Sequence, residues 1–167
     1  MKFFFDTEFI EDGRTIDLIS IGIVSEDGKE YYAESAEVNL MKANQWVEAN
    51  VLPFLTPGKE KPRAAIAREI LNFIDNCAPK NFDGTPSKYF KPEFWAYYAD
   101  YDWVALCQLY GTMMELPKGW PMYCRDIKQL CDSVGNPRLT KPQLEHNALA
   151  DARWNKEQYE MLVRLVK

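Results

Sequence analysis

The chain has 167 residues, of which 47% are apolar and 14% aromatic, so it is expected to fold and not to be disordered. This length suits one domain, residues 1–167, with a core large enough to need no disulfide or metal staple. The formal charge of −5 argues against a broad basic surface for nucleic acid. No run of eighteen apolar residues is present, which excludes a membrane-spanning helix.

The cellular address is expected to be the cytoplasm. The stretch from Met1 to Asp6 holds too few apolar residues for a secretory signal. The four cysteines form no Cys-x-x-Cys pair and have no histidine at zinc-ligand spacing, so they are interpreted as small buried side chains.

Charge is distributed unevenly along the chain. Residues 1–117 hold 11 Lys and Arg against 19 Asp and Glu, a net of −8, whereas residues 118–167 have a net of +3. Both parts are consistent with ordinary solvated surface. The alternative is a carboxylate-rich site that faces a mildly basic C-terminal rim, where metal ions supply much of the attraction for phosphate.

The first part of the chain predicts three antiparallel strands. An apolar run ends at Asp6, and a β-branched alternating run follows a polar break that contains the Asp12-Gly13 turn signal. Asp27-Gly28 has the composition of a hairpin turn. The strands are expected at residues 3–5, 16–24 and 29–33.

Helical and apolar segments alternate in the rest of the chain. The longer helices show apolar residues on one face, and Asp126 has the side chain of a helix cap. Together these segments predict an α/β fold with a mixed five-stranded sheet flanked by helices. The helices are expected at residues 43–50, 62–74, 102–110, 127–134 and 147–166, and the strands at 94–98 and 122–124.

Two carboxylates close the first predicted strand. Asp6 and Glu8 are two residues apart, so their side chains point to the same face. Such a pair is costly unless solvent or a cation neutralises it, and hard cations such as Mg²⁺ or Mn²⁺ prefer oxygen ligands. The pair therefore indicates a metal site, although exposed acids are also common at strand ends.

Further candidates lie at two helix starts. Asp102 follows a predicted strand and precedes a predicted helix. Aspartate is favoured at the helix N-cap, so either Asp102 or Asp100 could cap this helix. His146, the one histidine of the chain, is compatible with a structural role or a catalytic one. Asp151 lies among apolar neighbours and needs a partner, which is either a metal or a salt bridge to Arg125 or Arg138.

Taken together, these motifs resemble those of the DEDDh 3′-5′ exonucleases, which include ribonuclease T, oligoribonuclease and proofreading subunits of polymerases. The order Asp-x-Glu, Asp and His-x-x-x-x-Asp covers nearly the whole chain. Three further stretches resemble the bacterial polyadenylate-specific 3′-exoribonuclease branch. Many relatives have His-Asn where this chain has Tyr97-Tyr98, which leaves substrate contacts open there. The three stretches are residues 6–13, 99–104 and Gly119-Trp120-Pro121.

This resemblance implies a ribonuclease H-like fold with two divalent ions, Mg²⁺ or Mn²⁺, per active site. Asp6, Glu8, Asp102 and Asp151 would hold the ions, and His146 would be the general base, because a free histidine titrates near neutral pH.

The substrate would be the 3′ end of single-stranded RNA, including poly(A), or of DNA. Phe9 is a candidate for stacking on the terminal base or for core packing. Glu8 is a candidate for a ribose hydroxyl, and Trp103 for either substrate contact or helix packing. A homodimer is compatible with the resemblance. An inactive nucleic-acid-binding module, an endonuclease on the same fold and a plain interaction domain are the alternatives.

Overall fold

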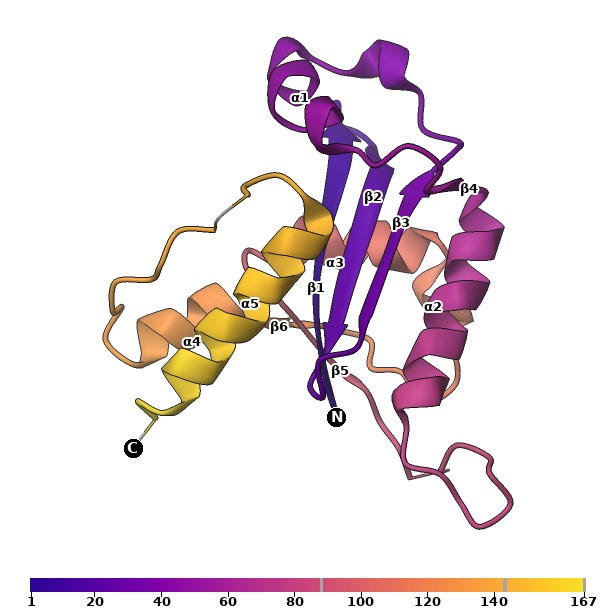
Figure 1. Cartoon of the computed structure of the whole chain (residues 1–167), viewed down its shortest axis with the longest axis vertical. Coiled ribbons are helices and arrows are strands. Elements are labelled where there is room, and N and C mark those ends of the chain that lie inside the picture. The colour runs from indigo at the N-terminus through magenta and orange to yellow at the C-terminus, as the bar shows by residue number, and fades with distance from the viewer. Residues whose placement is uncertain (88, 143, 167) are drawn as a thin grey trace.

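The computed structural model describes residues 1–87, 89–142 and 144–166. One mixed sheet is flanked by helices on both faces, so the predicted α/β fold class is confirmed (Figure 1). The strands are β1 (Lys2–Glu11), β2 (Ile16–Ser25), β3 (Glu30–Ser35), β4 (Glu60–Lys61), β5 (Glu93–Ala96) and β6 (Arg125–Asp126). The α-helices are α1 (Gln45–Asn50), α2 (Arg63–Cys77), α3 (Asp100–Gln108), α4 (Ile127–Ser133) and α5 (Ala148–Val163). Single 3₁₀ turns lie at Leu40–Lys42, Leu52–Phe54 and Met113–Glu115.

The sheet has the strand order β4-β3-β2-β1-β5-β6, which places β1 near its middle. β1 and β2 pair antiparallel, and so do β2 and β3, as predicted. The sheet has six strands instead of the five expected. The additional strand, β4, is a two-residue parallel extension beside the end of β3, too short to show any alternation. β6 lies at Arg125–Asp126 and not at 122–124, because the predicted apolar stretch is a bend before the strand.

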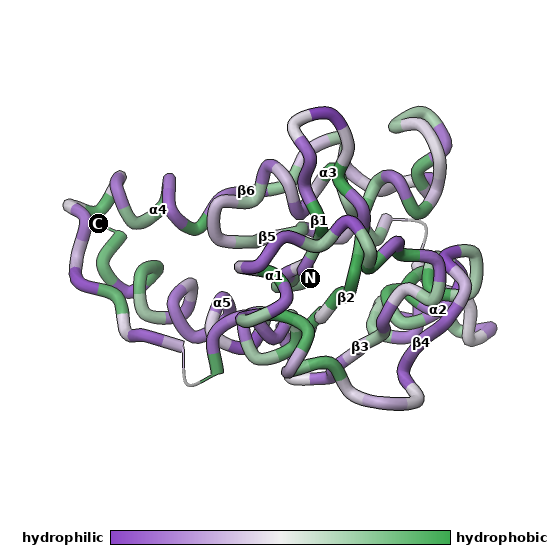
Figure 2. The backbone as a smooth tube through the Cα atoms, turned by 90° about the horizontal axis from the view of Figure 1, so that it is seen from above, coloured by the Kyte–Doolittle hydropathy of each residue, from purple (hydrophilic) through white to green (hydrophobic). Residues whose placement is uncertain are grey.

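Alternate residues of β1 supply the cores on the two faces of the sheet. Phe3 and Phe5 pack with α2 and α3, whereas Phe4 packs with α4 and α5. α5 crosses the sheet in front of β1, and α3 lies behind it (Figure 1). Figure 2 shows hydrophobic stretches along β2 and alternating hydrophilic and hydrophobic positions along α4 and α5. None of the described helices has the length and apolar character needed to cross a membrane.

β1 continues to Glu11, through the segment predicted to be a polar break. Its polar residues are explained by their surroundings: Asp6 and Glu8 face a cleft, and the side chain of Thr7 bonds to α3. The register between β1 and β2 shifts between Glu8 and Phe9, which is a β-bulge. Bulges bend a strand and re-aim its side chains, and they are frequent beside functional sites. The turn signal at Asp12-Gly13 is confirmed, with Gly13 at a φ of +78°.

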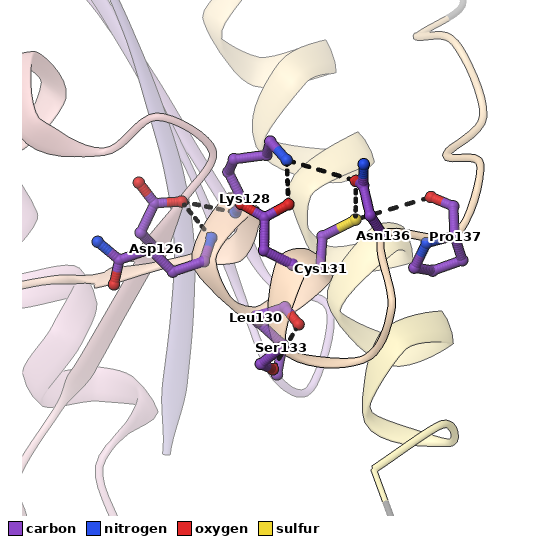
Figure 3. Close-up of polar contacts among 9 residues, drawn as sticks. Asp126, Lys128, Leu130, Cys131, Ser133, Asn136 and Pro137 are labelled. Atoms are coloured by element: carbon purple, nitrogen blue, oxygen red, sulfur yellow. Dashed lines mark hydrogen bonds and ion pairs between the residues drawn. The ribbon is translucent and has the colours of Figure 1, made fainter.

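The predicted cap of α4 is confirmed. The Asp126 carboxylate accepts hydrogen bonds from the backbone N–H groups of Lys128, at 2.5 Å, and Gln129, at 3.3 Å (Figure 3). These are donors that the first turn of a helix leaves unsatisfied. Farther along α4, the buried Cys131 thiol lies against Asn136 (Figure 3). All four cysteines are free thiols.

Candidate active site

Asp6 and Glu8 project from β1 at the point where the sheet opens. β5 pairs with β1 only as far as Phe4, so no strand from the described residues lies on that side of the next part of β1. The Asn155 side chain of α5 donates a hydrogen bond to the Phe5 carbonyl at 2.8 Å. Asn155 is 1% exposed and lies one helical turn beyond Asp151. This bond therefore fixes α5 against β1 next to the two carboxylates.

Asp102 is held in place by the residue that lies between those two carboxylates. Its Oδ1 accepts hydrogen bonds from the Thr7 backbone N–H at 2.8 Å and from the Thr7 hydroxyl at 2.6 Å. α3 begins at Asp100, and Ala99 occupies the N-cap position without a side-chain bond. Neither Asp100 nor Asp102 is the N-cap, so the capping interpretation was wrong. Asp102 lies inside the first turn and is 6% exposed.

Asp151 lies in the first turn of α5, which approaches β2 very closely. Its Oδ2 accepts a hydrogen bond from the His146 backbone N–H at 2.8 Å, and Asn147 caps the helix by accepting from Ala150 N–H. The salt-bridge alternative fails within the described residues, because Arg125 pairs with Glu93 and Arg138 forms no ion pair there.

Three of the four candidate carboxylates meet at one point. Oxygen atoms of Asp6, Glu8 and Asp151 all lie within 4.8 Å of one another. Asp102 lines the same cleft, of about 560 Å³, although its oxygens are not part of this group of three. Residues from β1, α3 and α5, far apart in the sequence, are thus brought to one opening.

Burial raises the pKa of all four carboxyl groups, and the charges of neighbouring site acids raise it further for Asp6 and Glu8. Desolvation is the largest cause for each one. The Glu8 pKa rises to about 8, with the charges of Asp151 and Asp102 adding to desolvation. The Asp6 pKa rises well above its usual range through burial and the charges of its three neighbours. The Asp102 and Asp151 pKa values rise to about 6, because hydrogen bonds to each carboxylate partly oppose desolvation.

The donor set fits a hard divalent cation. All the converging atoms are carboxylate oxygens, which Mg²⁺ and Mn²⁺ prefer over the sulfur and nitrogen sets typical of zinc. A bound cation would also offset the repulsion that raises the pKa values of Asp6 and Glu8. Asp6, Glu8 and Asp151 are therefore the residues able to hold ions, with Asp102 adjacent.

The pH dependence of stability follows from these pKa shifts. Raised pKa values mean that the folded metal-free protein binds more protons than the unfolded chain between about pH 4 and pH 8. Its free energy of unfolding should therefore fall as the pH rises through that window. We expect Tm in EDTA to decrease from pH 5 to pH 8, and this decrease to weaken with saturating Mn²⁺. Glu8→Gln should flatten the upper part of the metal-free curve, and an unchanged slope would contradict the pKa shift of Glu8.

His146 lines the cleft immediately before α5. Its backbone φ is +67°, an uncommon conformation for a residue other than glycine, and it is held there by the bond from its N–H to Asp151. Its imidazole and the Trp46 indole of α1 form a T-shaped pair with ring centroids 4.7 Å apart. The histidine thus has a partner at its backbone, Asp151, and a partner at its ring, Trp46.

Aromatic side chains form much of the cleft wall. Phe9 stacks on Tyr101 with ring centroids 5.8 Å apart and planes 12° from parallel, and both line the cleft. Trp103 does not line it. This residue is 8% exposed and packs in the core against Phe5 and Phe94, so the packing alternative holds.

Several cleft residues were missed at the sequence level. Tyr98 is 62% exposed and has a φ of +56°, and only its difference from the His-Asn of relatives marked it. Nothing in the sequence signalled Trp46, which comes from a separate short helix, or Asn155, whose partner is a distant backbone carbonyl. The missed residues that line the cleft are Thr7, Trp46, Tyr97, Tyr98, Tyr101, Pro142, Glu145, Trp154 and Asn155.

Gly22 of β2 sets how closely α5 can approach the carboxylates. It pairs with Asp6, and a Cβ atom at this position would overlap the backbone of Ala148. Gly22→Ala should therefore displace the start of α5, lower the free energy of unfolding by about 1–3 kcal/mol and reduce the exonuclease activity that the resemblance implies. Denaturant unfolding and activity per folded protein measure both effects. Gly28→Ala is the control: its Cβ would meet open space, but its φ of +86° strains any side chain, so it should lose stability and keep its activity per folded protein.

The sequence was compared with known protein families. A family model described as the 3′-5′ exoribonuclease Rv2179c-like domain matches residues 1–163. The chain belongs to this family. Two curated relatives support the assignment, each 45% identical over 157 residues, which cover 92% of this chain and 88% of the relative. They are the 3′-5′ exoribonuclease Rv2179c of Mycobacterium tuberculosis strain ATCC 25618/H37Rv and the 3′-5′ exoribonuclease MT2234.1 of strain CDC 1551/Oshkosh.

Membership in the Rv2179c-like family confirms the enzyme class predicted from the sequence, a hydrolytic 3′-5′ exonuclease. The match covers β1, α3 and α5, and thus every element that brings a carboxylate to the cleft. The narrower resemblance to the DEDDh set and to its polyadenylate-specific branch stays a prediction.

Proposed function

We propose that this protein is a divalent-metal-dependent exoribonuclease that releases nucleoside 5′-monophosphates from the 3′ end of single-stranded RNA. The observation that carries the proposal is the meeting of Asp6, Glu8 and Asp151 within 4.8 Å, with Asp102 at the same cleft. Family membership supports RNA as the substrate. A binding module without catalysis is disfavoured, because unneutralised carboxylates at the centre of its cleft would repel phosphate.

Each carboxylate has a place in this scheme. Asp6, Glu8 and Asp151 would hold two ions. Asp102 would complete the set with its Oδ2, because its Oδ1 accepts both hydrogen bonds from Thr7. When bound, Mg²⁺ or Mn²⁺ would neutralise charge on the scissile phosphate and on the departing oxygen.

His146 is proposed to accept a proton from the water that attacks phosphorus. The bond between phosphorus and the O3′ of the preceding nucleotide breaks, O3′ takes a proton from solvent, and the terminal nucleotide leaves with its 5′-phosphate. The bond from the His146 N–H to Asp151 keeps this side chain beside the carboxylates during the reaction.

Phe9 and Tyr101 are proposed to bind the terminal base. Their stacked rings line the cleft, and Tyr101 is 52% exposed. Stacking on an aromatic face tolerates any base, so this contact favours a single-stranded end without fixing its sequence. Glu8, which lines the same cleft, is proposed to contact a hydroxyl of the terminal ribose.

A time course on matched RNA, poly(A) and DNA oligomers tests the proposal directly. Each 5′-labelled oligomer is incubated with Mg²⁺, with Mn²⁺ or with EDTA, and products are resolved by length. We expect a ladder that shortens by single nucleotides on RNA and no reaction in EDTA. Internal fragments would indicate an endonuclease, faster loss of DNA would overturn the RNA preference, and activity in EDTA would overturn the metal requirement.

A further inference from the structure

A short loop beside the cleft, residues 137–142, carries two exposed cations. Neither Arg138 nor Lys141 forms an ion pair within residues 1–87, 89–142 and 144–166. Most other cations of the C-terminal part are engaged: Arg125 with Glu93, Lys128 with Asp132, Arg153 with Glu30, and Lys156 with Glu160. Positive charge that is open to a ligand is thus found beside the cleft.

Thr140 fixes this loop to the cleft wall. The Trp154 indole N–H donates to the Thr140 carbonyl at 3.0 Å, and the Gln158 amide donates to the Thr140 hydroxyl at 2.7 Å. Gln158 also accepts from the Thr140 N–H at 3.3 Å and is 2% exposed. Trp154 and Pro142 line the cleft. Because Arg138 and Lys141 flank Thr140, α5 holds their backbones next to the opening.

The cleft needs such a surface if its substrate is longer than one nucleotide. The carboxylates lie at the centre of the cleft, where the terminal phosphate would react. Every upstream nucleotide adds one more negatively charged phosphate, and these phosphates would lie outside the cleft. Glu145 also lines the cleft and has the wrong sign for phosphate. The segment 138–141 does not line the cleft itself, but it leads into Pro142 of the lining and carries the favourable charge. Its two cationic residues are separated by at most about 10 Å of backbone.

We infer that Arg138 and Lys141 bind the phosphates of the nucleotides upstream of the 3′ terminus of single-stranded RNA. The inference rests on the proposed function and adds the path that the RNA strand takes as it leaves the cleft. Each cation that contacts a phosphate releases counterions, so binding should weaken as the salt concentration rises. On a single strand, each contact adds about −0.7 to the slope of the logarithm of the binding constant against the logarithm of the salt concentration. Such contacts carry no sequence information and would serve any RNA.

The test compares the double variant Arg138→Ala/Lys141→Ala with the wild-type protein on a 5′-labelled 12-mer RNA and on a dinucleotide with a free 5′-hydroxyl, which has no phosphate upstream of the scissile one. We expect kcat/KM on the 12-mer to fall about tenfold, with little change on the dinucleotide. The salt slope of 12-mer binding should become shallower by about 1.4. Binding is measured by anisotropy in the His146→Ala background, so that the RNA is not consumed.

Lys118→Ala/Arg164→Ala is the matched control. It removes the same charge from two exposed residues without ion pairs in the described part of the chain, away from the cleft lining. Equal losses in both double variants would reduce the effect to net charge and overturn the inference, as would equal losses on the dinucleotide and the 12-mer. A wild-type protein that binds the 12-mer with the expected slope but hydrolyses no RNA would instead overturn the proposed function alone.

Discussion

Asp6→Asn is expected to lower kcat at least about 10³-fold and, at the same time, to stabilise the metal-free protein. Activity should fall because the variant loses an ion ligand at the centre of the group formed with Glu8 and Asp151. Stability should rise because an amide of the same shape carries no charge into a site where burial and three acidic neighbours already raise the pKa of Asp6. At pH 8 in EDTA the gain should be about 1–2 kcal/mol, or roughly 2–8 °C in Tm.

Steady-state kinetics with Mn²⁺ and thermal unfolding in EDTA measure the two effects. Asp132→Asn is the control, since this exposed acid pairs with Lys128 on α4, outside the cleft, and should change neither activity nor metal-free Tm by much. If Asp6→Asn is as active as the wild type, the carboxylate group does not take part in catalysis. If it destabilises the metal-free protein, the electrostatic description of the site is wrong.

His146→Ala is expected to reduce kcat by about 10²–10⁴-fold while leaving ion binding nearly unchanged. The side chain is proposed to accept a proton, whereas the contact that positions Asp151 comes from the backbone N–H, which alanine retains. Kinetics on the RNA 12-mer and Mn²⁺ binding to the same variant separate the two roles. Turnover close to that of the wild type would remove His146 from the mechanism, and loss of ion binding would show a structural role instead.

The structure brings three of the four predicted carboxylates together, and part of this follows from local geometry that the sequence contains. Asp6 and Glu8 share a face on any strand, and this holds even though the strand was expected to end before Glu8. The convergence of Asp151 with them depends on Gly22 and Asn155, which set the position of α5 on the sheet. No local pattern encodes that packing, so the sequence identified the acids but not what positions them.

The errors also have local causes. A strand whose outward side chains serve a cleft loses its polar–apolar alternation, and β1 was therefore cut short. Asp102 is of a residue type favoured at helix caps. Its carboxylate instead accepts hydrogen bonds from the backbone N–H and the hydroxyl of Thr7, which is distant in sequence. The two-residue strands β4 and β6 are defined by pairing with neighbours and have too few residues for a periodic signal.

Direct titration of the protein with Mn²⁺, followed by calorimetry or by the electron paramagnetic resonance signal of the free ion, tests the central claim most directly. Wild-type protein should bind two ions per chain in a saturable manner and release protons as it does so, because carboxyl groups with raised pKa values must ionise. Asp6→Asn should lose at least one of the two. No saturable binding by the wild-type chain, or unchanged binding by Asp6→Asn, would contradict the assignment of these carboxylates as a cation site.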